Sequence, residues 1–61
     1  MTTMTTTETA AAEYAGALAA FLADPSFANS ERLYATESAF GRARAEEAIA
    51  KSNVLLAMLA A

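Results

Sequence analysis

Seven acidic side chains are the residues of this sequence whose chemistry could support catalysis or metal binding. Carboxylates that share a site can act as an acid/base pair or form a cage for a metal ion. Their spacing favours neither use, because Glu46 and Glu47 are adjacent and so point about 100° apart on a helix. Glu31 and Glu37 are separated by neither the three nor the four residues that place side chains on one helix face. The pattern therefore predicts no catalytic, cofactor-binding or metal-binding residue.

Histidine and cysteine are absent from the sequence. Without histidine the chain lacks the commonest general base and metal ligand, and its serines have no such base to activate them as nucleophiles. Without cysteine, disulfides and thiolate metal sites are excluded. The two glycines stand singly inside helical patterns, so no glycine-rich phosphate loop is present. We therefore expect a protein that is not an enzyme and that needs no cofactor.

Residues 30–60 read as one long helix, which carries most of the charge and most of the large apolar side chains. The apolar positions of this stretch form two stripes that point roughly opposite ways. We expect the first, called the Phe27 stripe, to pack on the rest of the chain, and the second, called the Leu33 stripe, to lie on the outside. The Phe27 stripe contains Phe27, Tyr34, Ala45, Ile49, Ser52, Leu55, Leu56 and Leu59, and the Leu33 stripe contains Leu33, Phe40, Glu47, Val54 and Met58.

A shorter helix is expected over residues 6–23, after a flexible threonine-rich lead-in at residues 1–5. Thr5 and Glu8 have the S/T-x-x-E spacing of a capping box, which marks a helix start. Asp24-Pro25 ends this helix, because proline disfavours helical geometry at the residue before it. Residues 24–29 then form a turn, either irregular or with a short turn of helix, and the two helices run antiparallel. We expect the second helix to continue through its glycine, since no proline or cap accompanies it.

The second helix is the longer one, and at about 1.5 Å per residue it should overhang the first by roughly 15–20 Å. The overhang, residues 52–61, is the most apolar segment of the chain. The back of the first helix carries small residues that allow close approach of another helix. A helix that is apolar nearly all round is normally buried all round. We therefore expect an interface between copies of the chain, formed by Ala12, Gly16, Ala19, Ile49, Ser52, Leu55, Leu56 and Leu59.

The short length of the chain supports the same expectation. A chain of 61 residues forms one domain, and such chains bury only about 60% of their unfolded surface, so they often depend on assembly for stability. We predict an all-α fold, an antiparallel helical hairpin with a short first and a long second helix. This hairpin should pair with itself, most simply as a homodimer that forms a four-helix bundle.

Charge and hydropathy narrow the partners and the location. The net charge is −3, and the four basic residues are mixed among acids, so we expect no nucleic-acid binding. The N-terminal residues lack the basic start of a secretory or transit peptide. The longest uncharged runs, 14–23 and 52–61, are each about half of a membrane span. We therefore expect a cytoplasmic protein without membrane contact.

These observations predict a protein–protein interaction module. The first hypothesis is a small homo-oligomeric regulatory or inhibitory protein of the phage or mobile-element accessory type. It would bind a larger partner through the exposed members of the Leu33 stripe, namely Leu33, Phe40, Val54 and Met58. The alternative is a structural subunit of a particle, shell or scaffold. An inhibitor closes into a small oligomer, whereas an assembly subunit continues to add copies.

Overall fold

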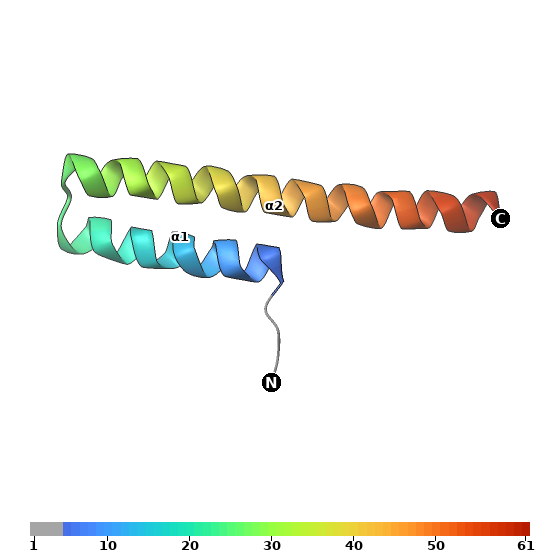
Figure 1. The fold of residues 1–61 in the computed structure, drawn as a ribbon, viewed down its shortest axis with the longest axis horizontal. Coiled ribbons are helices and arrows are strands. Elements are labelled where there is room, and N and C mark those ends of the chain that lie inside the picture. The colour runs from blue at the N-terminus through green and yellow to red at the C-terminus, as the bar shows by residue number, and fades with distance from the viewer. Residues whose placement is uncertain (1–4) are drawn as a thin grey trace, which may run out of the picture.

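Two antiparallel α-helices joined by a short turn make up the computed structural model, which describes residues 5–61. Helix α1 spans Thr6–Ala23 and helix α2 spans Phe27–Ala60, and the two lie side by side (Figure 1). No strand occurs within residues 5–61. The fold is therefore all-α with two helices. Most of the expected lead-in, residues 1–4, lies outside the described residues.

The start of α1 is fixed by Thr5, whose backbone is extended and whose hydroxyl accepts a hydrogen bond from the Glu8 N–H at 3.1 Å. This is the hydroxyl half of the expected capping box. At the other end, the Asp24 N–H donates to the Ala20 carbonyl at 2.9 Å, and Asp24 itself has left helical geometry. Pro25 explains this ending, because it disfavours the helical region for the residue before it.

The second helix begins three residues earlier than the sequence indicated. Ser26 is its N-cap, since the Ser26 hydroxyl accepts from the Asn29 N–H at 3.2 Å. The side chain of Asn29 is free for another use, and its Nδ2 donates to the Ala20 carbonyl at 3.3 Å and to the Asp24 carbonyl at 2.8 Å. Asn29 thus joins the start of α2 to the end of α1 and holds the turn closed.

Helix α2 is unbroken over 34 residues, including Gly41, and therefore extends about 24 Å further than the 18-residue α1. The dimensions of the molecule are 53 × 28 × 12 Å, so it is one helix thick. Its radius of gyration is 15.7 Å, whereas a compact chain of this length would have about 10 Å. Both faces of the helix layer and both of its outer edges are consequently open to contact.

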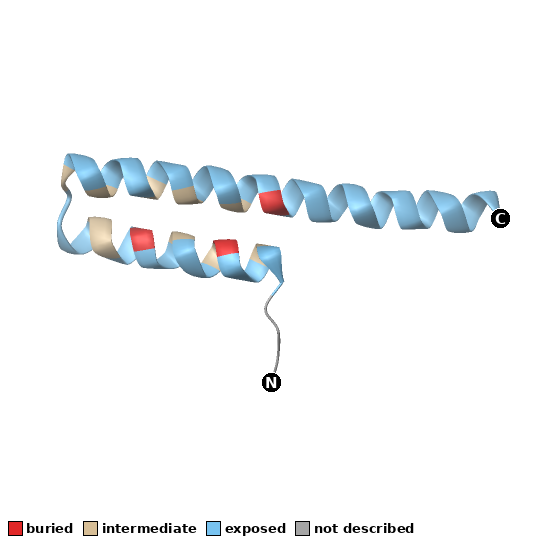
Figure 2. Cartoon of the chain, viewed as in Figure 1, coloured by how far each residue is buried: buried red, intermediate tan, exposed pale blue. Residues whose placement is uncertain are grey.

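The interior of the hairpin is a narrow seam of small side chains. The buried hydrophobic residues among residues 5–61 are Ala10, Ala17 and Ala43, and no large side chain is fully buried there. Figure 2 shows buried and half-buried positions along the facing sides of the helices and none on the overhang. Because alanine buries little apolar area, this seam contributes little hydrophobic free energy to folding.

The structure reverses the two stripes of α2. Leu33 and Phe40, expected on the outside, are half-buried against α1. Phe27 and Tyr34, expected in the core, are 79% and 74% exposed. The prediction was wrong because it weighed large apolar residues alone and took the stripe with more of them as the buried one.

Polar residues explain the reversal, because two of them share the seam with Leu33 and Phe40. Asn29 satisfies its side-chain N–H groups on carbonyls of the turn. The Thr36 hydroxyl donates to the Arg32 and Leu33 carbonyls of its own helix at 2.9 and 3.0 Å. A polar side chain that is satisfied locally can face a neighbouring helix without a desolvation penalty.

Candidate protein-interaction surface

Phe40 is half-buried and makes its main contacts within the hairpin. Its ring centroid lies 5.9 Å from that of Tyr14 on α1, with an interplanar angle of 37°. The guanidinium carbon of Arg44 lies 5.6 Å from the same centroid, in the geometry of a cation–π contact. Leu33 is also half-buried, so Leu33 and Phe40 are less exposed than Val54 and Met58, the other two residues expected to bind a larger partner.

Glu47 forms the last described side-chain hydrogen bond between the helices before the overhang. The Thr7 hydroxyl donates to Glu47 Oε2 at 2.7 Å and lies 3.5 Å from the Ala43 carbonyl oxygen. Lys51 Nζ pairs with Glu47 Oε1 at 3.2 Å. The Thr7 hydrogen bond, followed by the contact with Lys51, holds the pKa of Glu47 below its ordinary value of 4.5. Glu47, the charged member of the Leu33 stripe, therefore belongs to the seam.

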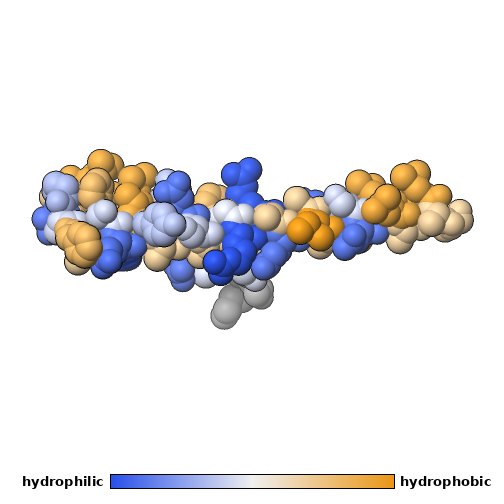
Figure 3. Space-filling view, turned by 90° about the horizontal axis from the view of Figure 1, so that it is seen from above, coloured by the Kyte–Doolittle hydropathy of each residue, from blue (hydrophilic) through white to orange (hydrophobic). Residues whose placement is uncertain are grey.

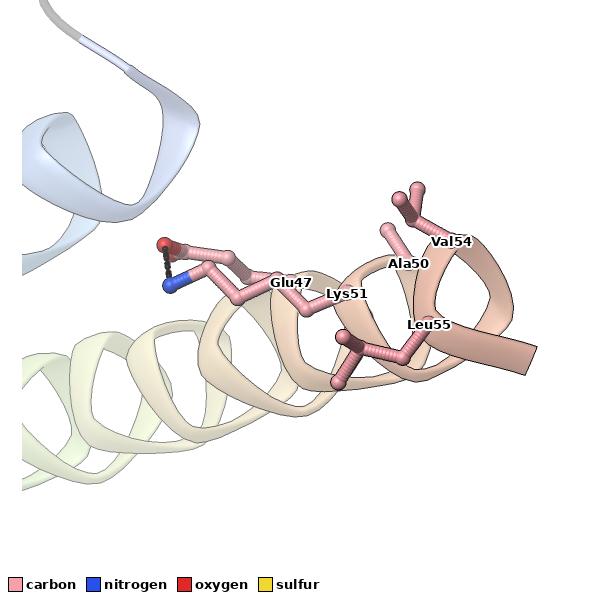
Figure 4. Close-up of a pocket in the computed structure, with 5 residues that line it drawn as sticks. All are labelled: Glu47, Ala50, Lys51, Val54 and Leu55. Carbon is pink, nitrogen blue, oxygen red and sulfur yellow. Dashed lines mark ion pairs between the residues drawn. The ribbon is translucent and has the colours of Figure 1, made fainter. Parts of the chain in front are cut away.

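Beyond Glu47, α2 continues without α1 beside it, and all residues from 44 to 61 are exposed. Val54 and Met58, the last two members of the Leu33 stripe, are 59% and 68% exposed. Part of this segment forms a shallow groove of about 460 Å³. Figure 4 shows Lys51 reaching Glu47, with Ala50, Val54 and Leu55 projecting from the free part of the helix. The groove is therefore apolar with one ion pair at its edge.

The Phe27 stripe is exposed along α2, mainly on the side that points away from α1, and Leu55 lies where the stripe borders the groove. Its large members span the helix from the first residue to the last turn. Their exposed fractions are 79% for Phe27, 74% for Tyr34, 60% for Ile49 and Leu55, 63% for Leu56 and 84% for Leu59. A row of large apolar side chains along one helix face is a feature of interaction surfaces. The stripe is the most extensive such surface among the described residues.

The residues expected to form an oligomer interface occupy two separate edges of the hairpin. The first edge belongs to α2 and contains Ile49, Ser52, Leu55, Leu56 and Leu59. Ala12, Gly16 and Ala19 are exposed on α1, on the side away from α2. At Gly16 an added Cβ would lie 3.8 Å from the tip of Arg32, so this position is partly approached from α2. The structure thus does not join the two groups into one continuous surface.

The residues that close the hairpin were not identified from the sequence. Thr7 and Glu47 are 40 residues apart, and no local spacing rule relates them. The structure uses Ser26 as the N-cap of α2 and Asn29 to bridge the turn. An asparagine within the turn that follows Asp24-Pro25 is the one signal that could have suggested a turn-closing side chain.

Metal binding and membrane crossing find no support among the described residues. Residues 5–61 contain no group of three or more acidic, histidine or cysteine side chains placed to hold a metal ion. Neither described helix is long and apolar enough to cross a membrane. No protein-family model, curated protein or solved structure matches this chain. The exposed faces of α2 are therefore the candidate functional site.

Proposed function

We propose that this chain is a non-enzymatic protein–protein interaction module that associates with itself through the outer face of α2. The observation that supports this function is the exposed Phe27 stripe, which runs the length of α2 opposite α1. A large apolar side chain gains about 1.5–3 kcal/mol when it is fully buried. Burying this row against another helix would give more than the alanine seam of the hairpin gives internally.

The hairpin also needs such a partner for its own stability. Its buried residues are three alanines, and isolated helices are marginal in water unless an apolar face is packed. Chains below about 70 residues usually gain the missing stability from disulfides, metals or assembly. This sequence has no cysteine and no histidine. Assembly is the means of stabilisation that its composition favours.

A larger partner, if the protein is a regulatory or inhibitory factor of the phage accessory type, would bind the overhang. Val54 and Met58 remain exposed there, beside the groove that includes Ala50 and Leu55. Apolar residues spaced by four on a protruding helix suit insertion into a groove of another protein. This surface replaces the one expected from the sequence, which included Leu33 and Phe40.

An assembly subunit of a particle, shell or scaffold is the second candidate, and one observation favours it. The hairpin presents two different open edges, the large apolar residues of α2 and the small residues Ala12, Gly16 and Ala19 of α1. Contact between unlike edges gives a closed ring when the rotation between copies closes, and an open chain when it does not. A protein with two different interfaces can therefore add copies repeatedly.

Light scattering over a concentration series tests both candidates, using the native chain and a truncation that ends at Lys51. The truncation keeps the Thr7–Glu47 and Glu47–Lys51 contacts and removes the apolar end of α2. We expect a dimer for the native chain and a monomer for the truncation. A native mass that keeps rising with concentration would favour the assembly subunit. A monomer for both chains would overturn self-association.

A pair of matched double variants separates the two surfaces of the overhang. Leu56→Ser with Leu59→Ser alters the Phe27 stripe, whereas Val54→Ser with Met58→Ser alters the groove side. We expect only the first pair to weaken self-association, because only those residues lie on the outer face. Equal loss in both variants would mean that the whole tip is one interface, and no surface would then remain for a larger partner.

A further inference from the structure

The outer side of α2 has the periodicity of a coiled-coil seam. Starting at Phe27, steps of four and three residues in alternation lead to Leu59, and every position on this path is exposed. The path consists of Phe27, Glu31, Tyr34, Ser38, Gly41, Ala45, Ala48, Ser52, Leu55 and Leu59. Such spacing averages 3.5 residues and keeps one face of a helix toward a second helix. Glu47 and Val54 do not lie on the path, because they belong to the side of α2 that faces α1 or its extension. We call this path the outer seam.

The outer seam has small side chains along its middle and larger ones toward both ends, and the one clear mismatch in size between matching positions is Tyr34 with Ser52. Large apolar residues occupy both ends, with Phe27 at one and Leu59 at the other, while the centre contains Gly41 and Ala45. Figure 3 looks onto this edge and shows apolar side chains gathered at its two ends and hydrophilic ones toward the middle. A surface with this symmetry is complementary to a second copy of itself, which is the condition for a closed two-fold interface.

We infer that two copies of the chain pair through their outer seams with α2 antiparallel to α2, and with the two-fold axis level with Ala43. This inference rests on the proposed self-association and specifies its orientation and register. Phe27 faces Leu59 of the second copy, and Gly41 faces Ala45 of the second copy at the centre. The small central residues let the helix axes approach closely, and the apolar tip of each copy covers the turn end of the other.

Glu31 favours the antiparallel arrangement over the parallel one, whereas Arg42 and Arg44, one residue from the two-fold axis, each lie near their own copy in the antiparallel pair. In a parallel pair in the same register, Glu31 would face its own copy, and burying two like charges is unfavourable. In the antiparallel pair, Glu31 faces Leu55 near the end of the interface, and its carboxylate can extend to water. The antiparallel pair also brings Glu37 beside Lys51 of the second copy, once on each side of the two-fold axis. The antiparallel helix dipoles add to this preference.

Disulfide trapping with single cysteines tests the register, because the native sequence has no cysteine. Ser38 and Ala48 are small, exposed, and face each other across the inferred interface. Oxidation of a mixture of Ser38→Cys and Ala48→Cys chains should give a heterodimeric disulfide. Each variant alone should not cross-link, since its two copies are about 15 Å apart along the axis, beyond the roughly 7 Å that a disulfide can bridge.

Ala50→Cys provides the matched control for Ala48→Cys, because Ala50 lies on the groove side of α2. Mixed with Ser38→Cys, it should not cross-link. If Ser38→Cys and Ala48→Cys each link to themselves, the pairing is parallel and the inferred orientation is wrong. If light scattering shows a dimer but no mixture links, another face is used, and the proposed self-association stands without this register. A monomer at every concentration would overturn both.

Gly41→Leu tests the close approach at the centre of the interface without relying on cross-linking. An added Cβ at Gly41 meets no atom within 4 Å in the single chain, so the hairpin should retain its helix content. In the pair, the leucine would overpack the centre, and the dissociation constant should rise about tenfold or more. Ala15→Leu, at an exposed position of α1, should leave it unchanged. A Gly41→Leu protein that dimerises as tightly as the native chain would contradict the inferred interface.

Discussion

The rings of Tyr14 and Phe40 lie with their centroids 5.9 Å apart, inclined by 37°, and this contact joins the middle of α1 to the middle of α2. Arg44 adds a cation–π contact from one turn further along α2. Since the buried positions of the seam are alanines, this half-buried aromatic pair supplies much of the apolar contact between the helices. It helps to hold this side of α2 against α1.

Phe40→Ala should destabilise the hairpin by about 1–3 kcal/mol, less than the loss of a fully buried phenylalanine, because the ring is half-buried. Urea unfolding followed by circular dichroism, at a concentration where the chain is monomeric, measures this change. Tyr34→Ala is the matched control, since Tyr34 is 74% exposed and should have little effect on the monomer. An effect of Tyr34→Ala equal to that of Phe40→Ala would contradict the observed orientation of α2.

The hydrogen bond from Thr7 to Glu47 should make part of the stability dependent on pH. The pKa of Glu47 is lowered from 4.5 in the folded chain, first by Thr7 and then by Lys51. A lowered folded pKa contributes stability that is present above the unfolded value and is lost as pH falls through the folded value. The melting temperature should therefore decrease below about pH 4.5, and by less in Glu47→Gln than in the native chain.

Thr7→Val provides an independent measure of the same contact, because valine keeps the shape of threonine and removes the donor. The pKa of Glu47, followed by NMR of its carboxyl carbon, should rise toward 4.5 in this variant. A pKa that stays as low as in the native chain would mean that Lys51 alone sets it. Thr9→Val, on an exposed position of the same helix, is the control.

Asn29→Ala should weaken the closure of the turn. The variant loses the hydrogen bonds from Nδ2 to the Ala20 and Asp24 carbonyls, each worth about 0.5–1.5 kcal/mol in net stability. Asn29→Asp keeps the size of the side chain but cannot donate, and it should be destabilised at least as much. Ser30→Ala alters the adjacent exposed position and should change the free energy of unfolding little. Denaturant unfolding of the three variants measures these differences.

Gly41→Ala should stabilise the monomeric hairpin by roughly 0.5–1 kcal/mol, because glycine in a helix interior loses more backbone entropy than alanine on folding. Neither glycine has a positive φ, and the added methyl group at Gly41 meets open space. Gly16→Ala should behave similarly, with its methyl group in ordinary contact with Arg32. Thermal melts of the two variants, which contain one extra methyl group each, provide the comparison. A decrease in melting temperature at Gly41 would indicate a local break in α2.

Local signals in the sequence determined much of the secondary structure. The Thr5 hydroxyl caps α1, Asp24-Pro25 ends it, and an alanine-rich composition favours helix on both sides of the turn. Each of these effects acts within about four residues, so the sequence alone contains the necessary information. The start of α2 was less well determined, because Ser26, Asn29 and Ser30 are all suitable N-caps. In the structure Ser26 caps the helix, since the Asn29 side chain instead donates to the Asp24 carbonyl.

The tertiary structure alone decided which stripe of α2 faces α1. Both stripes have helical periodicity, so periodicity cannot choose between them. The choice follows from which polar side chains can be satisfied in the seam: Asn29 by the turn, Thr36 by its own helix and Glu47 by Thr7. These partners are remote in sequence or belong to the backbone of the folded chain. The large apolar residues of the Phe27 stripe are left outside, because the Leu33 stripe occupies the side of α2 that contacts α1.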